Sequence, residues 1–419
     1  MGGMTMLYLA SKYPNLFAAE LFVSCQWDIN ELDKLDSQKF IYIVSNGDDK
    51  ASAGQKEVIQ MLNSKNVKLL NYKIIKEYFD YCFLFNIFSK LENYFYIKNQ
   101  NITMVKVSIL GSTGVIGKNV AFTLARADTV DEIVLFAREG SIEKAKGESF
   151  DMYDALAAED IDCRLTPSTD FEDIKNSNIV LISAGTPRKE GMTRMDLAIP
   201  NAEIVRDYAE KIAIYAPDSI ILIATNPVDV MTTIALEASG FKKSKVIGIG
   251  NHLDSLRLKA YFANQIDINS SEVHTRVIGE HGDHMVPLLS STTIGGIPLK
   301  YFVQSVDMDI PRLINRLRKA GNTIISKKGA TEYGPAFAIS NIISTIITDS
   351  HKILTVSTYL NGEIAGVQGV SLGVPVVLSK KGVAMIVPIH MNDYEENKFK
   401  DAAEIVRQAT EEVKNNLNY

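Results

Sequence analysis

His281 is the residue whose type and neighbours best suit proton transfer near neutral pH. It lies in Gly279-Glu280-His281-Gly282-Asp283, a stretch that we expect to form a loop between two strands. A carboxylate that holds an imidazole in one tautomer and stabilises its protonated form would make this histidine a general acid and base. Asp254 is the candidate carboxylate, near the start of a helix expected from Asn251-His252-Leu253-Asp254-Ser255-Leu256-Arg257 onward. Without such a partner, a histidine between glycines is more often structural than catalytic.

Three arginines lie where they could bind an anionic substrate. Arg257 follows Asp254 by three positions, so both side chains lie on the same side of the expected helix. Arg188 and Arg194 lie in a basic, glycine-containing loop that follows a buried strand. Because loops at the carboxyl ends of parallel strands overlie the ligand crevice, these two arginines could reach one dianion together. The alternatives are an ordinary solvated loop and an ion pair within the helix.

Glycines follow the first strand of the pattern at the spacing of a dinucleotide site. They allow a tight turn, close approach of the backbone to a pyrophosphate and close packing of helix on strand, while a helix N-terminus favours the anion. A glycine-rich turn without a ligand has the same pattern, so this motif is weak by itself. The candidate cofactor ligands in this stretch are Gly111, Ser112, Thr113, Gly114, Val115, Ile116 and Gly117.

Arg138 indicates which nicotinamide cofactor is preferred. Sites that select NAD usually have a carboxylate at the end of the second strand, where it accepts a hydrogen bond from the ribose 2′-hydroxyl. Here the sequence is Leu135-Phe136-Ala137-Arg138-Glu139. The small residue removes the repelling carboxylate and the arginine supplies a cation for a 2′-phosphate, so we predict that NADP is preferred over NAD. Alternatively, Arg138 is a surface residue and Glu139 binds the ribose; similar catalytic efficiencies with NADH and NADPH would refute the NADP prediction.

Thr225 and Asn226 follow another buried strand, in Thr225-Asn226-Pro227-Val228-Asp229. The Asn226 amide can donate to or accept from a substrate oxygen, and Pro227 fixes the turn that presents it. We include both Thr225 and Asn226 among the candidate cofactor ligands. A simple Asn-Pro turn is the alternative.

Short apolar runs that alternate with helical segments from Met104 onward must position these residues. Nearly all-apolar runs of this length are typical of parallel strands covered on both faces, so we expect a Rossmann-type, doubly wound parallel sheet. After Asn251, long helices mix with antiparallel strands around the turn at 379–382, which predicts an α+β substrate domain. Strands are expected at 105–110, 132–136, 179–184, 219–225, 246–249, 370–378 and 383–389, and a helix at 118–126.

The composition is that of a soluble globular protein. The 419 residues are 46% hydrophobic and 22% charged, which is enough chain for two or three domains. A net charge of -6 gives no reason to expect a nucleic-acid partner, and the apolar runs are too short to span a membrane. The three cysteines have no CxxC spacing, so we expect neither disulfides nor a metal site. With no secretory signal pattern, this favours the cytoplasm.

Five motifs together carry a family resemblance. GSTGVIG, PRKEGMTR, TNPVD, LDSLR and GEHGD, in this order and at these separations, resemble the lactate/malate dehydrogenase family, and within it the archaeal-type malate enzymes. The resemblance covers residues 104–419. It implies reversible hydride transfer between (S)-malate and NAD(P)⁺, giving oxaloacetate and NAD(P)H. It also implies a homodimer or homotetramer.

The resemblance assigns a role to each candidate residue. His281 would take the hydroxyl proton of malate, Asp254 would orient it, and Arg257 would bind the C1 carboxylate through a bidentate fork. Arg194, on a closing loop, would polarise the carbonyl. Asn201 and Asn226 would form hydrogen bonds near the substrate and the nicotinamide.

Arg188 would select the substrate. In this family the corresponding position is arginine in enzymes that take a dicarboxylic acid, and typically glutamine in those that take lactate. An arginine that faces a methyl group would be buried without its counterion, which selects against pyruvate. A lactate or other 2-hydroxy acid dehydrogenase is the alternative. Glu332-Tyr333-Gly334-Pro335 departs from the bacterial malate dehydrogenases, in which the corresponding stretch supplies a small polar residue and a methionine to the pocket wall.

Residues 1–72 form a separate region, in which we expect helices at 5–11 and 54–65 and a strand at 40–45. Met1-Gly2-Gly3 and the segment 9–19 resemble the helix after the nucleophile elbow of an α/β-hydrolase esterase, and Gly47-Asp48-Asp49-Lys50 resembles the loop that bears its acid. The GxSxG serine and any histidine are missing from this region, so an esterase triad is not expected. We expect a partial hydrolase-like remnant over 1–72, an aromatic-rich linker over 73–103, a dinucleotide-binding domain over 104–249 and a substrate domain over 250–419.

Overall fold

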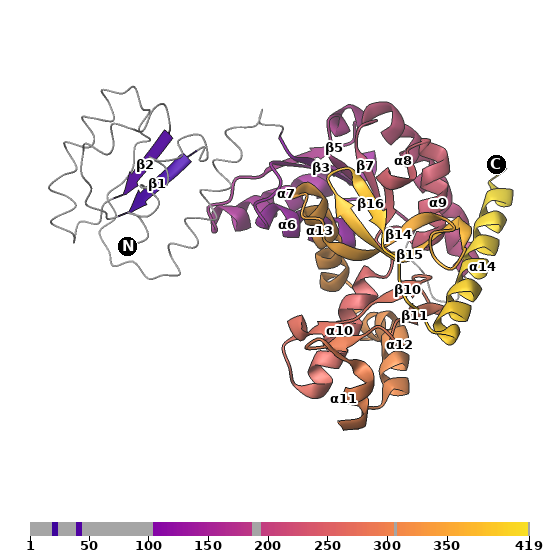
Figure 1. The fold of residues 1–419 in the computed structure, drawn as a ribbon. Coiled ribbons are helices and arrows are strands. Elements are labelled where there is room, and N and C mark those ends of the chain that lie inside the picture. The colour runs from indigo at the N-terminus through magenta and orange to yellow at the C-terminus, as the bar shows by residue number, and fades with distance from the viewer. Residues whose placement is uncertain (1–18, 24–38, 44–103, 187–193, 306–307, 418–419) are drawn as a thin grey trace. The chain divides into compact units, whose positions relative to one another are not determined.

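The computed structural model describes residues 19–23, 39–43, 104–186, 194–305 and 308–417, and the chain divides into two compact units, 1–103 and 104–419. In the first unit, β1 (Ala19–Val23) and β2 (Lys39–Ile43) form a parallel pair (Figure 1). The strand expected at 40–45 overlaps β2. The helices expected at 5–11 and 54–65, and the linker at 73–103, lie outside the described residues.

Six parallel strands form the centre of the second unit. Their order is β8-β7-β6-β3-β4-β5, so the chain starts in the middle, moves to one edge and then crosses to the other. All residues of β4, β6 and β7 are buried, as expected for strands covered on both faces. This is the Rossmann-type fold expected from the apolar runs. The strands are β3 (Lys106–Leu110), β4 (Glu132–Phe136), β5 (Arg164–Ser168), β6 (Ile179–Ile182), β7 (Ile220–Ile223) and β8 (Val246–Gly248).

Helices cover both faces of this sheet (Figure 1). On one face α6 contacts α7 and α13, and on the other face α8, α9 and α14 contact one another. The helices are α6 (Val115–Arg126), α7 (Ile142–Ala157), α8 (Arg194–Tyr215), α9 (Val228–Ser239), α13 (Tyr333–Ile347) and α14 (Asp393–Asn416). Short 3-10 turns lie at Glu139–Ser141, Phe171–Ile174, Lys243–Lys245 and Ser270–Glu272.

The parallel sheet continues into antiparallel strands from the C-terminal part of the chain. β14 pairs with β8 at Ser357 and Gly248, so one 11-stranded sheet crosses the domain boundary expected near Gly250. The strands expected at 370–378 and 383–389 are present as β15 and β16, although β16 ends at Ile386. The added strands are β14 (Ile353–Asn361), β15 (Gln368–Ser379), β16 (Gly382–Ile386), β10 (Val277–Gly279) and β11 (Met285–Pro287).

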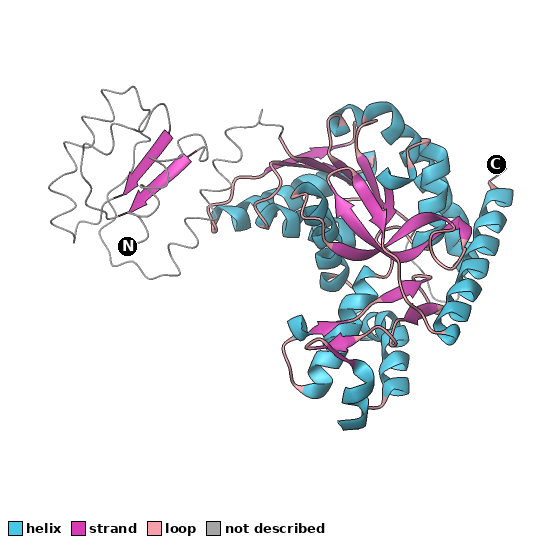
Figure 2. Ribbon diagram, viewed as in Figure 1, coloured by secondary structure: helices cyan, strands magenta, loops and turns pink. Residues whose placement is uncertain are grey.

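A second, smaller core lies beside this sheet (Figure 2). It is built around buried Leu258, Phe262 and Leu317. Its elements are α10 (His252–Ile266), α11 (Leu299–Ser305), α12 (Ile310–Lys328), and the three-stranded sheet β9 (Val273–His274), β12 (Thr293–Ile294) and β13 (Ile297–Pro298). Among the helices in the described ranges, none has the length and apolar character needed to cross a membrane.

The structure also differs from the sequence expectations at α6 and β5. Helix α6 begins at Val115 rather than 118, because Gly117 packs inside its first turn against Gly111. Strand β5 was not expected, since Arg164-Leu165-Thr166-Pro167-Ser168 is neither apolar nor alternating. It lies at the edge of the sheet, where a proline does not interrupt a hydrogen-bonded ladder on both sides.

Candidate active site

The glycine-rich stretch forms a tight turn between β3 and α6. Gly111 has φ +98°, and a Cβ there would lie 2.6 Å from the Ala184 backbone nitrogen. A Cβ on Gly117 would lie 2.3 Å from the Gly111 carbonyl oxygen. The N-cap residue of α6, Gly114, is exposed and makes no side-chain cap, so the first-turn N–H groups suit a phosphate. The turn therefore fits a dinucleotide and leaves no space for larger residues at Gly111 and Gly117.

The end of β4 holds this turn and the residues proposed to select the cofactor. The Phe136 carbonyl accepts hydrogen bonds from Gly111 N at 3.2 Å and from Ser112 Oγ at 3.1 Å. Arg138 and Glu139 follow after Ala137, and both are exposed. Either side chain is accessible to a ribose at this edge, so the NADP preference stays a prediction.

Two buried polar residues connect the loops after β6 and β7. Asn201 accepts from Thr186 N at 2.7 Å and donates to the Asn226 carbonyl at 2.8 Å. Thr225 Oγ1 donates to the Ala184 carbonyl at 2.6 Å. These bonds engage the Asn201 amide and the Thr225 hydroxyl within the protein, while the Asn226 side chain is exposed. Asn201 and Thr225 thus fix the crevice wall, and their contacts with a cofactor remain predictions.

The basic loop lies partly outside the described residues. Arg188 belongs to the segment 187–193, and α8 begins at Arg194, whose side chain is likewise not described. The substrate roles of both arginines therefore remain predictions.

His281 and Asp254 are brought together by the loop between β10 and β11 and the first turn of α10. His281 Nδ1 lies 2.8 Å from Asp254 Oδ2, and the Asp254 side chain is 1% exposed. Burial disfavours the charged ring, but the Asp254 carboxylate outweighs it and raises the pKa of His281 above its usual value. Burial likewise opposes ionisation of Asp254, yet His281 and Arg257 hold the pKa of this carboxyl below its usual value. The pair is arranged to stabilise a protonated imidazole.

Arg257 completes a chain of three charged groups. Its Nη1 donates to Asp254 Oδ1 at 3.2 Å, as the spacing of three residues on one helix predicted. The guanidinium therefore has donors left over for a second carboxylate. The Arg257 side chain is 16% exposed, which is consistent with access from the crevice.

Two polar residues that the sequence analysis did not single out form hydrogen bonds to Asp254 and to the backbone around His281. Asn251 Nδ2 donates to the Glu280 carbonyl at 3.0 Å and to Asp254 Oδ2 at 3.4 Å. Asp229 Oδ2 accepts from the His281 backbone N–H at 2.7 Å. In the sequence, Asp229 is an ordinary first-turn acid of a helix and Asn251 an ordinary residue before one, so neither carried a signal for these contacts.

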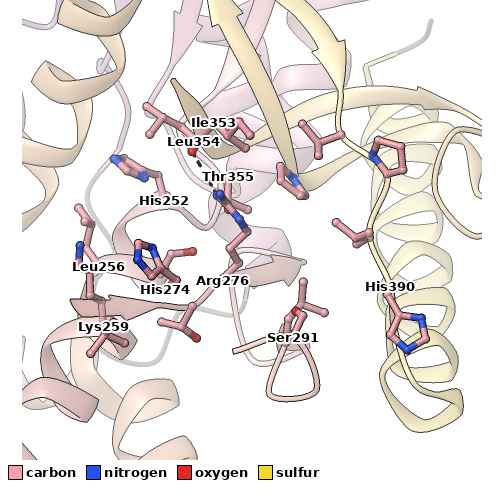
Figure 3. A pocket seen from close by; sticks show the side chains of 18 residues that line it. His252, Leu256, Lys259, His274, Arg276, Ser291, Ile353, Leu354, Thr355 and His390 are labelled. Atoms are coloured by element: carbon pink, nitrogen blue, oxygen red, sulfur yellow. Dashed lines mark hydrogen bonds between the residues drawn. The ribbon is translucent and has the colours of Figure 1, made fainter. Parts of the chain in front are cut away.

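A basic cavity lies beside α10 (Figure 3). Its volume is about 400 Å³, and His252, Leu256 and Lys259 of α10 line it from one side. These positions lie on one side of the helix, whereas Asp254 and Arg257 lie about half a turn away. Arg276 crosses the cavity and donates to the Ile353 carbonyl at 3.2 Å. The cavity is therefore separate from the His281 site.

Contacts and burial identify His281 among the six histidines of the chain. Burial lowers the pKa of His252 to about 4, so this ring is neutral at pH 7 and bonds Asn341 instead of a carboxylate. No aspartate or glutamate is among the described residues that line the cavity of His252, so no carboxylate of this lining would orient its ring or stabilise the charged form. His284 and His351 do bond carboxylates, but their side chains are 45% and 60% exposed, against 18% for His281.

Comparisons with known proteins agree with this architecture. The sequence model of the lactate/malate dehydrogenase NAD-binding domain matches residues 105–248, and that of the α/β C-terminal domain matches 251–417. The chain is 63% identical to the malate dehydrogenase of Methanosphaera stadtmanae, over 75% of this chain and 99% of that protein. It is 44% identical to an L-2-hydroxycarboxylate dehydrogenase (NAD(P)(+)) of Methanocaldococcus jannaschii, over 74% of this chain and all of that protein.

A solved structure is also similar. The malate dehydrogenase from Aeropyrum pernix is 33% identical with a TM-score of 0.68, covering 73% of this chain and 97% of that one. The two domain models match nearly all of residues 105–417, and the relatives of the chain are dehydrogenases. We conclude that the chain is an NAD(P)-dependent oxidoreductase and belongs to the lactate/malate dehydrogenase family.

Proposed function

We propose that this chain interconverts (S)-malate and oxaloacetate, with His281 as the acid/base residue. The observation that carries the proposal is the single buried carboxylate of Asp254, which bonds both the His281 imidazole and the Arg257 guanidinium. The 63% identity to the malate dehydrogenase of Methanosphaera stadtmanae supports malate as the substrate. Asp254 thus links the group that moves the proton to the group that binds the substrate.

His281 moves one proton in each direction. Because Nδ1 is bonded to Asp254, Nε2 is the ring nitrogen left for the substrate. In malate oxidation the neutral ring accepts the hydroxyl proton at Nε2, and in oxaloacetate reduction the protonated ring returns it to the carbonyl oxygen. The turn from Gly111 to Gly117 would hold the nicotinamide cofactor, which when bound would supply or accept the hydride. Asp254 stabilises the positive ring between these two states.

Arginines bind and polarise the substrate. Arg257 holds the C1 carboxylate with the guanidinium donors that Asp254 does not use. Arg194 polarises the C2 carbonyl, and Arg188 binds the C4 carboxylate that distinguishes oxaloacetate from pyruvate. Asn226, exposed at the crevice, donates to the substrate, and Asn201 fixes it through the Asn226 carbonyl.

His281→Asn tests the proton-transfer role. Loss of a positioned acid/base group should lower kcat by about a hundredfold or more in both directions, with NADPH binding unchanged. Retention of the native kcat at all pH values would overturn the proposal.

Arg188→Gln tests the substrate. Steady-state kinetics with oxaloacetate and with pyruvate should show the ratio of their kcat/KM values falling by at least about tenfold, because the second carboxylate loses its charged partner. Lys189→Gln removes a neighbouring charge and should leave the ratio unchanged. An unchanged ratio for Arg188→Gln would favour the second candidate, a dehydrogenase of broader 2-hydroxy acids, which the similarity to the Methanocaldococcus jannaschii protein supports.

We propose that the enzyme prefers NADP over NAD. The support is Arg138, exposed at the end of β4 next to the turn that fits the dinucleotide. Arg138→Ala should raise the KM for NADPH about tenfold and leave the KM for NADH nearly unchanged, since only NADPH carries the 2′-phosphate. Equal kcat/KM values for the two cofactors in the native protein would refute the preference.

We propose that residues 1–72 derive from an α/β-hydrolase and take no part in the dehydrogenase chemistry. The parallel pairing of β1 with β2 and the division of the chain at Thr103 support this proposal. A chain that begins at Met104 should keep its kcat/KM for oxaloacetate. A loss of more than about tenfold would show that the extension is required.

The enzyme is proposed to act as a homodimer or homotetramer in the cytoplasm. Exposed aromatic side chains support association: Phe150 on α7 is 67% exposed and Phe337 on α13 is 61% exposed, and both helices contact α6. Apolar side chains of this size are typical of subunit interfaces. Sedimentation should give at least twice the chain mass of 46.4 kDa, and a monomer would contradict the proposal.

A further inference from the structure

One peptide group, between Glu280 and His281, is held on both of its edges by buried side chains. The Glu280 carbonyl accepts from Asn251 Nδ2 at 3.0 Å, and the His281 N–H donates to Asp229 Oδ2 at 2.7 Å. Asn251 is 0% exposed and Asp229 is 3% exposed. The backbone that carries the imidazole is therefore fixed independently of the Asp254 contact to its ring.

Asp229 lies where three elements meet. It belongs to the first turn of α9, and its Oδ1 accepts from Ser357 Oγ of β14 at 2.6 Å. Ser357 pairs across the sheet with Gly248 of β8 and Gly373 of β15, and Gly373 pairs with Gly279 of β10, just before the His281 loop. One row of the sheet thus sets the spacing between Asp229 and His281.

The two hydrogen-bond partners of Asp229 are uncharged groups, a hydroxyl and a backbone N–H. A buried carboxylate whose hydrogen-bond donors are uncharged is costly, because it loses its hydration, and the charge that lowers the pKa of Asp229 is that of the His281 ring. Such a cost is typical of residues kept for a function, since an uncharged side chain of the same size would form similar hydrogen bonds.

We propose that Asp229 is a positioning residue for the proton transfer, which fixes the His281 backbone and adds a second negative charge beside the ring. The inference rests on the proposed function, because it requires His281 to carry the proton. In this arrangement Asp254 approaches the ring at Nδ1 and Asp229 approaches the backbone of the same residue.

The other charges around His281 set the direction of the effect. Asp254 and Asp229 favour the protonated ring, whereas Arg257 of α10 opposes it. Burial raises the pKa of Asp229 to about 6, while Ser357 and the His281 N–H lower it and Glu280 raises it. Asp229 is therefore ionised at pH 7 and above, where its charge acts on the ring.

Asp229→Asn separates the charge from the positioning. The amide oxygen can still accept from the His281 N–H, but the negative charge is lost. The kcat/KM for oxaloacetate, measured with NADPH from pH 5 to 9, depends on the protonated ring. In Asp229→Asn, the midpoint of this pH profile should move to lower pH by about one unit. On the acidic side of the midpoint, kcat/KM should fall by less than about threefold relative to the native protein.

Two further variants grade the effect. Ser357→Ala removes a donor that favours the ionised Asp229 and should shift the midpoint in the same direction by less. Asp229→Ala removes both charge and acceptor, and should lower kcat at least about tenfold at every pH without changing NADPH binding. Asp401→Asn, at an exposed position of α14, is the matched control and should keep the native profile.

The failures are distinguishable. If His281→Asn keeps its activity, the proposed function is wrong whatever Asp229 does. If His281→Asn is inactive but Asp229→Asn has the native midpoint and rate, only the inference about Asp229 is overturned. Should Asp229→Ala fail to fold, the midpoints of Asp229→Asn and Ser357→Ala still decide, because both keep a side chain of similar size.

Discussion

Asp254→Asn should disable the enzyme while leaving its fold and its cofactor site in place. In the native site the two carboxylate oxygens serve two cationic groups: Oδ2 bonds His281 Nδ1 at 2.8 Å, and Oδ1 bonds Arg257 Nη1 at 3.2 Å. An amide has one acceptor oxygen and one donor nitrogen. If its nitrogen faces Arg257, that contact becomes donor against donor. If its nitrogen faces His281, the amide donates to Nδ1 and holds the ring in the Nε2–H tautomer, which cannot accept the hydroxyl proton of malate.

The magnitude follows from these two contacts. Each hydrogen bond between charged groups contributes about 1.5–3 kcal/mol, and removing one partner of a buried charge pair costs about 3–5 kcal/mol. If this cost falls on the transition state, where the ring is positive or becoming so, kcat/KM should fall by about 10² to 10⁴. The pH midpoint of oxaloacetate reduction should also fall, since Asp254 favours the protonated ring.

The assay is steady-state reduction of oxaloacetate with NADPH between pH 5 and 9. NADPH affinity, measured by fluorescence, should stay within about twofold of native, because the turn at Gly111 does not contact Asp254. Asp401→Asn again serves as the control for an aspartate that is exposed and distant from the site. A loss smaller than tenfold with an unchanged midpoint would refute the reasoning.

Three other predictions concern stability and reactivity. Gly117→Ala should lower the free energy of unfolding by about 1–3 kcal/mol and weaken NADPH binding, because its Cβ would lie 2.3 Å from the Gly111 carbonyl. Gly147→Ala, inside α7 with nothing within 4 Å of the added Cβ, should instead raise the free energy of unfolding by up to about 1 kcal/mol in the same thermal melts, because alanine favours a helix interior over glycine. Burial raises the pKa of Asp229 to about 6 in the folded protein, above its unfolded value. Because the folded state binds this proton more tightly, the contribution of Asp229 to the free energy of unfolding decreases as pH rises from about 4 to 6. Asp229→Asn should therefore be more stable than native above pH 6, by up to about 3 kcal/mol, in urea unfolding, and equal or lower stability at pH 8 would contradict this. Cys163 is buried and burial raises its pKa to about 12, so peptide mapping should show no alkylation of this thiol until the protein unfolds.

Much of the fold was predictable because its signals are local. The apolar runs at β4, β6 and β7 are long enough to be strands and too apolar to face water, and all three were found within a few residues of the expected bounds. The edge strand β5 was missed since its residues include an exposed arginine and a proline. An edge strand is specified by its one neighbour rather than by its own pattern.

The candidate site was predictable where its contacts stay within one element or one motif. The contact between Asp254 and Arg257 follows from a spacing of three residues on a helix. The glycine positions of the turn after β3 follow from its close contacts, which no larger residue permits. Arg188 and Arg194 lie within or next to the undescribed segment 187–193, so their placement relative to His281 stays a prediction.

The sequence by itself determined the Rossmann-type α/β fold, the glycine turn and the identity of His281 as the candidate acid/base residue. Only the tertiary structure decided what holds His281 in place, namely Asp229 and Asn251, which lie 52 and about 30 residues away along the chain. The physical reason is that these hydrogen bonds depend on sheet register. The pairing of β14 with β8 at Ser357 places the Ser357 hydroxyl, 128 residues along the chain from Asp229, within reach of the Asp229 carboxylate on α9. The same carboxylate then also accepts from the His281 backbone. No local sequence pattern encodes that strand pairing.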